Sequence, residues 1–159
     1  MGQGGFLTRR DERYLEDYVE GAVHEFGPLS VSADEIIQFG RKYDPQSFHI
    51  DPEAAKASIY GGLIASGWHT SALFMRLFVD HYLPGPASLG SPGVDGLRWL
   101  KPVRPGDCLR LRVTVRKVKP SQSKPDRGVL FSFCEVLNQM DEVVLTMTAI
   151  NLVRYRGQG

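Results

Sequence analysis

The second half of the chain alternates apolar and polar residues with a period of two. Between positions 109 and 116 every second residue is aliphatic, and the same alternation returns over 129–133 and 143–149. Because successive side chains of a strand point to opposite faces of its sheet, each stretch predicts an antiparallel strand with one buried face. The turn-forming residues 138–141 are expected to join the last two strands as a hairpin, and the polar segment 121–128 is expected to be a loop.

The first half carries two helix starts. Ser32 is followed three residues later by Glu35, which is the pattern of a capping box, and apolar residues at helical spacing then predict a short helix ending near Tyr43. Farther along, Asp51 is expected to cap a second helix, with Pro52 at the first helical position, where its missing N–H costs nothing. The Asp44-Pro45 pair between them predicts a loop.

The longest apolar stretch spans residues 65–83 and is apolar on nearly all helical faces before Pro84-Gly85-Pro86 ends it. Such a helix is buried on most sides. One long buried helix followed by several long strands predicts an α+β fold in which an antiparallel sheet wraps around the helix. Because an open sheet exposes edge strands, we expect two copies of the chain to pair as a homodimer.

The 159 residues suit one domain, expected over residues 13–157. Residues 1–12 are polar and glycine-rich, which predicts a flexible tail. The mixed segment 14–26 favours a first strand, closed by a turn at Phe26-Gly27-Pro28.

Composition narrows the class of protein. The chain has 42% hydrophobic residues and only two cysteines, Cys108 and Cys134, each in an apolar stretch, which indicates buried free thiols in a reducing compartment. No segment has the length and apolarity of a membrane span, and no secretory signal precedes the first element. We therefore expect a cytoplasmic protein with no membrane partner.

The charges are unevenly distributed although the net charge is only +1. Residues 1–95 hold 7 Lys and Arg against 13 Asp and Glu, whereas residues 96–127 hold 10 against 2. The basic segment is either a solvated strand face or a surface that receives an anionic ligand such as a phosphorylated cofactor tail. No nucleic-acid-binding signature accompanies these charges, so no nucleic-acid partner is expected.

Polar residues gather in one segment with defined spacing: Asp44-Pro45-Gln46-Ser47-Phe48-His49, and later Ile64-Ala65-Ser66-Gly67-Trp68-His69. This segment resembles the motif of the MaoC-like, R-specific enoyl-CoA hydratases, in which an aspartate and a histidine five residues apart precede a glycine at the start of a buried helix. The resemblance extends from about Tyr18 to Arg154. It implies the hot-dog fold, with the sheet around the central helix.

The resemblance also implies a chemistry. Adding water to a trans-2-enoyl-CoA thioester, giving an (R)-3-hydroxyacyl-CoA, needs a base for water, an acid for the α-carbon and a donor for the thioester oxygen. Asp44 and His49 are the expected acid–base pair, with their individual roles open. Gly67 is the expected backbone N–H donor, with Ser66 and His69 as neighbours at the substrate. No cofactor is expected beyond the CoA within the substrate.

Two departures from the family motif keep alternatives open. The family's Asn-Pro is replaced by Gln46-Ser47, and the histidine before the glycine is Ser66. A hot-dog acyl-CoA thioesterase and a non-catalytic, nodulation-type acyl-CoA-binding protein therefore remain as rivals. A metal site is not expected, because no His-x-x-x-His pair or cysteine cluster accompanies Asp44 and His49. The aromatic residues of the buried helix are expected mainly as core packing: Trp68, Phe74 and Phe78.

Overall fold

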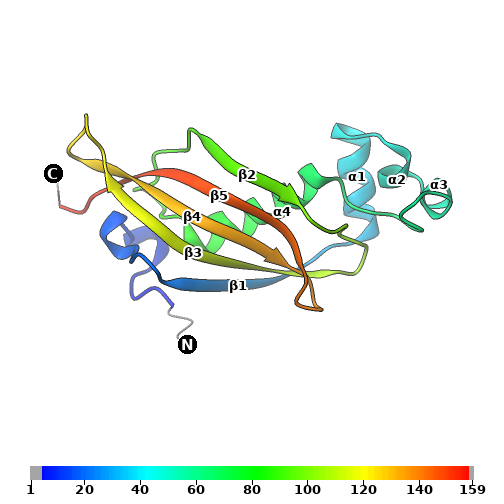
Figure 1. Ribbon diagram of the computed structural model, residues 1–159, viewed down its shortest axis with the longest axis horizontal. Helices are drawn as coiled ribbons and strands as arrows, with labels where there is room; N and C mark the ends of the chain where they lie inside the picture. Colours follow the sequence, from blue (N-terminus) through cyan, green and yellow to red (C-terminus); the bar gives the residue numbers. More distant parts are fainter. Residues whose placement is uncertain (1–4, 158–159) are drawn as a thin grey trace.

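A computed structural model describes residues 5–157 of the chain. Five antiparallel strands form one sheet in the order β1-β3-β4-β5-β2, and the shorter helices lie near its two ends (Figure 1). The strands are β1 (Val23–Ser30), β2 (Gly93–Trp99), β3 (Cys108–Pro120), β4 (Arg127–Leu137) and β5 (Val143–Arg154). The predicted hairpin at 138–141 is confirmed, because Asn138 and Glu142 pair through their backbones ahead of β5.

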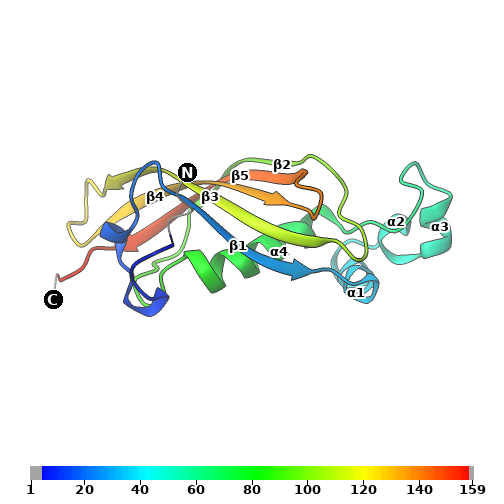
Figure 2. The same ribbon diagram turned by 90° about the horizontal axis from the view of Figure 1, so that it is seen from below.

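The sheet curves around one helix. Helix α4 (Gly67–Leu77) continues as a π-helical turn, η3 (Phe78–Tyr82), and lies against the concave side of the sheet (Figure 2). Phe74, Leu77 and Phe78 are buried against the inward side chains of the strands. The α+β hot-dog arrangement expected from the sequence is therefore confirmed. Helix α4 begins at one end of the sheet, close to three short helices.

The inward and outward faces of β3 follow the predicted alternation. Leu109, Leu111, Val113 and Val115 are fully buried, and the residues between them face outward. Two outward arginines are paired with carboxylates, Arg110 with Asp141 and Arg112 with Glu135. Both cysteines are free, with Cys134 buried inside the sheet and Cys108 partly buried.

Strand β1 differs from the prediction. The turn expected at Phe26-Gly27-Pro28 is absent, and the strand instead passes through an irregularity in its pairing with β3 between Phe26 and Leu29. Gly27 adopts φ +127°, and a Cβ there would lie 2.9 Å from the carbonyl oxygen of Leu109. Glycine is needed at this bulge, so the signal interpreted as a strand end marks a strand bend.

Strand β2 was not predicted at all. It pairs with β5 along one side, and its other side is the free edge of the sheet. All of its residues except Leu97 are exposed, and Gly93 and Gly96 both have positive φ. A strand with neither alternation nor a buried face leaves no periodic signal in the sequence.

Three helices lie beyond the end of the sheet: α1 (Ala33–Tyr43), α2 (Ser47–Ile50) and α3 (Pro52–Lys56) (Figure 1). The caps of α1 and α3 are confirmed, since the Ser32 hydroxyl accepts from the Glu35 N–H and the Asp51 carboxylate accepts from the N–H groups of Glu53 and Ala54. Helix α2 replaces the loop expected after Asp44. It is only one turn long, too short to show a helical period.

The N-terminal segment closes the other end of the central helix. It contains two short 3-10 turns, η1 (Arg10–Glu12) and η2 (Leu15–Asp17), and Phe6 stacks on His24 with ring centroids 4.1 Å apart. Phe6 lies within the segment expected as a tail, and its contacts tie part of that segment to the domain. Residues 1–4 lie outside the described residues. The domain limits of 13–157 stay a prediction.

Arg13 caps the end of η3 with its side chain. The guanidinium donates to the carbonyl oxygens of His81 and Tyr82, both at 2.9 Å, and to that of Thr8 at 3.2 Å. Arg13 is buried and covers the ring of Phe6 at 3.6 Å. A cation at the C-terminal end of a helix complements its dipole and satisfies carbonyls that have no helical donor.

Replacing Arg13 by alanine is expected to destabilise the fold by about 2–4 kcal/mol, because buried carbonyls lose a charged donor. Denaturant unfolding measures this free energy directly. Arg9→Ala is the matched control: Arg9 is exposed and pairs with exposed Asp11, a contact worth about 1 kcal/mol or less. Equal unfolding free energies for the two variants would contradict the capping role of Arg13.

Candidate active site

Asp44 occupies the C-cap of α1, where the helix ends before Pro45. Its two carboxylate oxygens have different donors. Oδ1 accepts from the Gln46 side-chain amide at 2.8 Å, and Oδ2 accepts from the Ser66 hydroxyl at 2.7 Å. Ser66 is completely buried and also caps α4 by accepting from the Trp68 N–H. The carboxylate is therefore held between the end of one helix and the start of another.

His49 lies in α2 with only 4% of its surface exposed. Its Nδ1 is 2.7 Å from the carbonyl oxygen of Ile64, which can only accept, so Nδ1 carries a proton. In the neutral imidazole Nε2 is then an acceptor, and this atom lies 3.3 Å from Asp44 Oδ2. The predicted pair is thus brought together, in a contact that becomes an ion pair when Nε2 takes up a proton.

Two residues outside the predicted catalytic and substrate-binding set shape this pair. Gln46 stands where the family motif has asparagine and donates to Asp44 directly, so the substitution retains a side-chain amide beside the carboxylate. Gly40 allows α1 to lie against α2, because a Cβ there would meet the Cβ of His49 at 3.0 Å. A glycine inside a helical pattern was the available signal for this close approach.

Hydrogen bonding sets the charge state of Asp44. Burial alone would raise the pKa of this carboxyl, but the donors Ser66 and Gln46, together with nearby His49, outweigh it and hold the pKa below its usual value. Donors that favour the charged form keep a carboxylate ionised to lower pH. Asp44 is therefore an ionised acceptor at neutral pH.

Ser66→Ala is expected to shift the acidic limb of any activity that needs ionised Asp44 to higher pH. Removing the hydroxyl takes away a donor that lowers the Asp44 pKa, so the carboxyl protonates at a higher pH than in the parent. The pH profile of kcat/KM measures the shift. Ser66→Thr keeps the hydroxyl and is the matched control. A Ser66→Ala profile that coincides with the parent's would contradict this role.

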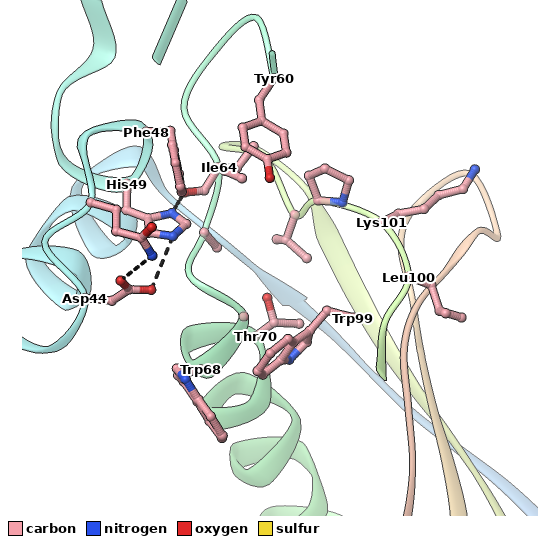
Figure 3. Close-up of a pocket in the computed structure, with 15 residues that line it drawn as sticks. Asp44, Phe48, His49, Tyr60, Ile64, Trp68, Thr70, Trp99, Leu100 and Lys101 are labelled. Carbon is pink, nitrogen blue, oxygen red and sulfur yellow. Dashed lines mark hydrogen bonds and ion pairs between the residues drawn. The ribbon is translucent and has the colours of Figure 1, made fainter. Parts of the chain in front are cut away.

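The pair faces a pocket of about 550 Å³. Figure 3 shows Asp44 and His49 on one side of it, Tyr60 with its hydroxyl pointing inward, and Trp99 across the start of α4. The lining residues come from the helical end, from the start of α4 and from the segment after β2: Asp44, Gln46, Phe48, His49, Tyr60, Ile64, Ala65, Gly67, Trp68, Thr70, Trp99, Leu100, Lys101, Pro102 and Val103.

Gly67 is the first residue of α4 and lines the pocket, as predicted. The first N–H groups of a helix have no helical acceptor, and the Gly67 N–H has none among the residues that the structure describes. The indole of Trp99 lies directly against Gly67, since a Cβ there would be 2.5 Å from ring atom Cδ2. Sequence reasoning missed Trp99, which comes from the unpredicted strand β2.

Other predicted site and core residues are placed differently. His69 does not line the pocket: it stacks on Phe39 of α1 with centroids 4.8 Å apart, and burial lowers its pKa. Ser66 contacts Asp44 rather than the cavity. Trp68 was expected in the core but is 59% exposed and lines the pocket.

The basic segment 96–127 does not form one surface. Arg110 and Arg112 lie on the outer face of the sheet in ion pairs, and Arg127 pairs with Asp126. Near the pocket, Lys101 pairs with Glu142, and Arg104 donates to the carbonyl oxygen of Tyr60 at 2.7 Å. The arginines on the strands therefore fit a solvent-exposed face with ion pairs better than a single surface that binds an anion.

Residues 5–157 contain neither a metal-binding cluster nor a membrane-spanning helix. Within that range no three or more His, Cys, Asp or Glu side chains are arranged to hold a metal ion. No helix in the same range has the length and apolarity needed to cross a bilayer. Asp51, which is close to Asp44 and His49 in the sequence, caps α3 with its carboxylate.

A sheet wrapped around a helix, with an Asp–His pair facing the N-terminus of that helix, defines the class of hot-dog hydratases and dehydratases. The model of the family "MaoC like domain" matches residues 18–129. A Bacillus subtilis (strain 168) protein, "Uncharacterized protein YdeM", is 30% identical over 127 residues, which cover 80% of this chain and 89% of that protein. The chain belongs to the MaoC-like domain family.

Solved structures agree with this assignment. A MaoC-like dehydratase from Rhodospirillum rubrum is 42% identical, with a TM-score of 0.84 over 91% of this chain and 99% of that one. The R-hydratase PhaJ1 from Pseudomonas aeruginosa shares the fold at 23% identity, with a TM-score of 0.72 over 90% of this chain and 86% of that one. The family and its relatives support hydratase or dehydratase chemistry in general.

Proposed function

We propose that the protein is an enoyl-CoA hydratase that adds water to trans-2-enoyl-CoA thioesters and gives (R)-3-hydroxyacyl-CoA, or catalyses the reverse dehydration. The observation that carries this proposal is the convergence of Asp44 Oδ2 and His49 Nε2, 3.3 Å apart, beside the unpaired N–H of Gly67. Nε2 of the neutral imidazole and the Asp44 carboxylate are both acceptors, so a water molecule that donates to one of them lies close to the other. The helix N-terminus suits the oxygen that gains negative charge.

The proposed steps balance as follows. The pair takes a proton from water while the hydroxide oxygen bonds to C3 of the substrate. The π electrons of the C2=C3 bond shift to form C1=C2, and the carbonyl π electrons move onto the thioester oxygen at the Gly67 N–H. The proton taken from water is then delivered to C2 as the thioester carbonyl re-forms. When His49 is neutral, its proton lies on Nδ1 in the bond to Ile64 and Nε2 is an acceptor, so His49 and Asp44 are both able to receive the first proton.

The CoA part of the substrate would occupy the open side of the pocket, where exposed Leu100 and Trp99 lie. This side suits a long polar group, because the opposite walls are buried: Ile64, Ala65, Thr70 and Val103. The protein is proposed to act in the cytoplasm, in fatty acid metabolism, and to require no separate cofactor.

A homodimer is proposed through β2 and the neighbouring face of α4. Strand β2 has a free edge, and apolar side chains outside the pocket are exposed on these two elements: Met75 and Val94. An unpaired strand edge beside apolar surface is a usual site for association. The mass of the protein in solution tests this, and a monomer at all concentrations would contradict it.

One assay separates hydration from the rival activities. Crotonyl-CoA is incubated with the protein, and loss of the conjugated double bond is followed alongside release of free CoA. Loss of the double bond without CoA release supports the hydratase, whereas CoA release identifies a thioesterase. Binding of the ester with neither reaction identifies a non-catalytic acyl-CoA-binding protein. A dehydrogenase specific for one enantiomer then reports the configuration of the product.

A further inference from the structure

Trp99 is attached to the start of α4 at two points. Its ring lies against Gly67, where a Cβ would be 2.5, 2.6 and 2.9 Å from ring atoms Cδ2, Cε2 and Cε3. Its Nε1 donates to the Ser71 hydroxyl at 3.2 Å, and that hydroxyl donates to the Gly67 carbonyl oxygen at 3.1 Å. The indole is thereby fixed along the first turn of the helix.

The position of Trp99 is not explained by the core. The residue is 45% exposed and ends the edge strand β2, so its ring contributes little to the buried interior. It lines the pocket, and Figure 3 shows it across the start of α4 from Asp44 and His49. It also meets Trp68 edge to face, with ring centroids 5.0 Å apart. The well-defined contacts of this ring are therefore those at the pocket.

We infer that Trp99 is a positioning residue that holds the substrate thioester against the Gly67 N–H and shields that contact from water. The inference rests on the proposed hydratase function. A hydrogen bond to a developing negative charge strengthens when water is excluded, because the local dielectric falls. The flat apolar face of an indole beside the donor provides that exclusion, and its bond to Ser71 keeps the ring from turning away.

Trp99→Ala is expected to lower kcat for crotonyl-CoA hydration by roughly 10- to 100-fold, less than the loss of a whole oxyanion donor, with a smaller change in KM. Trp99→Phe keeps an aromatic face and is expected to recover most of that loss. Met140→Ala is the matched control, because it truncates an exposed apolar side chain outside both the pocket and the proposed dimer surface. Its kcat is expected to stay within roughly twofold of the parent.

A double-mutant cycle tests whether Trp99 acts at Gly67. Alone, Gly67→Ala places a methyl group against the indole and displaces it. In the Trp99→Ala background the methyl meets no ring, so Gly67→Ala is expected to cost a smaller factor in kcat there. A purely structural Trp99 would instead give the same factor in both backgrounds, and that result would overturn the inference, as would parental kcat in Trp99→Ala.

A binding measurement separates this inference from the proposed function. The chain has two tryptophans, so Trp68→Phe leaves Trp99 as the sole tryptophan and Trp99→Phe leaves Trp68. Butyryl-CoA is expected to change the fluorescence of the first variant saturably and strongly, and that of the second much less. If the parent hydrates no enoyl-CoA but butyryl-CoA changes the Trp99 fluorescence, the proposed hydratase function is wrong. The proposed contact between Trp99 and the acyl-CoA is still supported. If the parent is active but butyryl-CoA does not change the fluorescence of the Trp68→Phe variant, the proposed contact between Trp99 and the substrate is wrong.

Discussion

Asp44→Asn is expected to lower the rate of enoyl-CoA hydration by about 100-fold or more, because a positioned acid or base contributes about 100- to 10,000-fold. Asparagine has the shape of aspartate and can still accept a hydrogen bond from Ser66. The link between the end of α1 and the start of α4 is therefore kept. What disappears is the negative charge and the ability to take a proton. His49→Ala should cause a comparable loss.

The measurement is kcat/KM for crotonyl-CoA, with circular dichroism and a melting curve for each variant. Asp34→Asn is the control, because Asp34 is an exposed carboxylate at the other end of the same helix, α1. The assignment of the pair would be wrong if Asp44→Asn or His49→Ala retained nearly the parental turnover with any substrate that the parent accepts.

Gly67→Val is expected to reduce hydration by about 100- to 1,000-fold, the usual cost of losing one oxyanion donor. A branched side chain at this position would occupy the space now taken by the Trp99 ring and the thioester. Trp99 is half-exposed and able to move outward, so the fold should survive with a modest fall in melting temperature. Activity and melting temperature are measured on the same preparation, with Ala72→Val as a control farther along the exposed side of α4.

Contact with Trp99 also changes the expectation for Gly67→Ala. Alanine is favoured over glycine within helices by up to ~1 kcal/mol, which by itself would raise the melting temperature. Displacing the indole from its bond to Ser71 opposes that gain. We therefore expect little change in stability but a clear loss of activity. A Gly67→Val protein that hydrates enoyl-CoA at the parental rate would remove Gly67 from the mechanism.

The elements with a strong period were predictable from the sequence. The alternation of β3, β4 and β5 and the apolar faces of α4 gave both the sheet and the helix it wraps. Strand β2 and helix α2 were not predicted from the sequence. Strand β2 is exposed on both faces, and helix α2 is a single turn. Neither buries enough apolar surface in a regular order to leave a pattern.

The candidate site was predictable only where spacing encoded it. Asp44, His49 and Gly67 lie in one segment with the spacing of a family motif, and the structure brings them to one pocket. His69 has the same proximity in sequence but points toward Phe39, since neighbouring residues of a helix face different directions. Trp99 lies 32 positions after Gly67 in the sequence, at the end of a strand that was not predicted. No local sequence pattern indicates its contact with Gly67.

The helical end that carries Asp44 and His49 lies beyond the end of the sheet, and its three helices bury few residues: Ile36, Gly40, His49 and Ala55. Polar contacts link it to the rest of the domain, among them Asp44 with Ser66, His49 with Ile64 and Arg104 with Tyr60. Segments with few buried contacts open at lower free energy than the core does. On gradual heating, catalysis should therefore cease while the circular dichroism of the sheet is still native, and cooling from that point should restore it. Thermal inactivation would then be a reversible detachment of the catalytic end, separate from global unfolding.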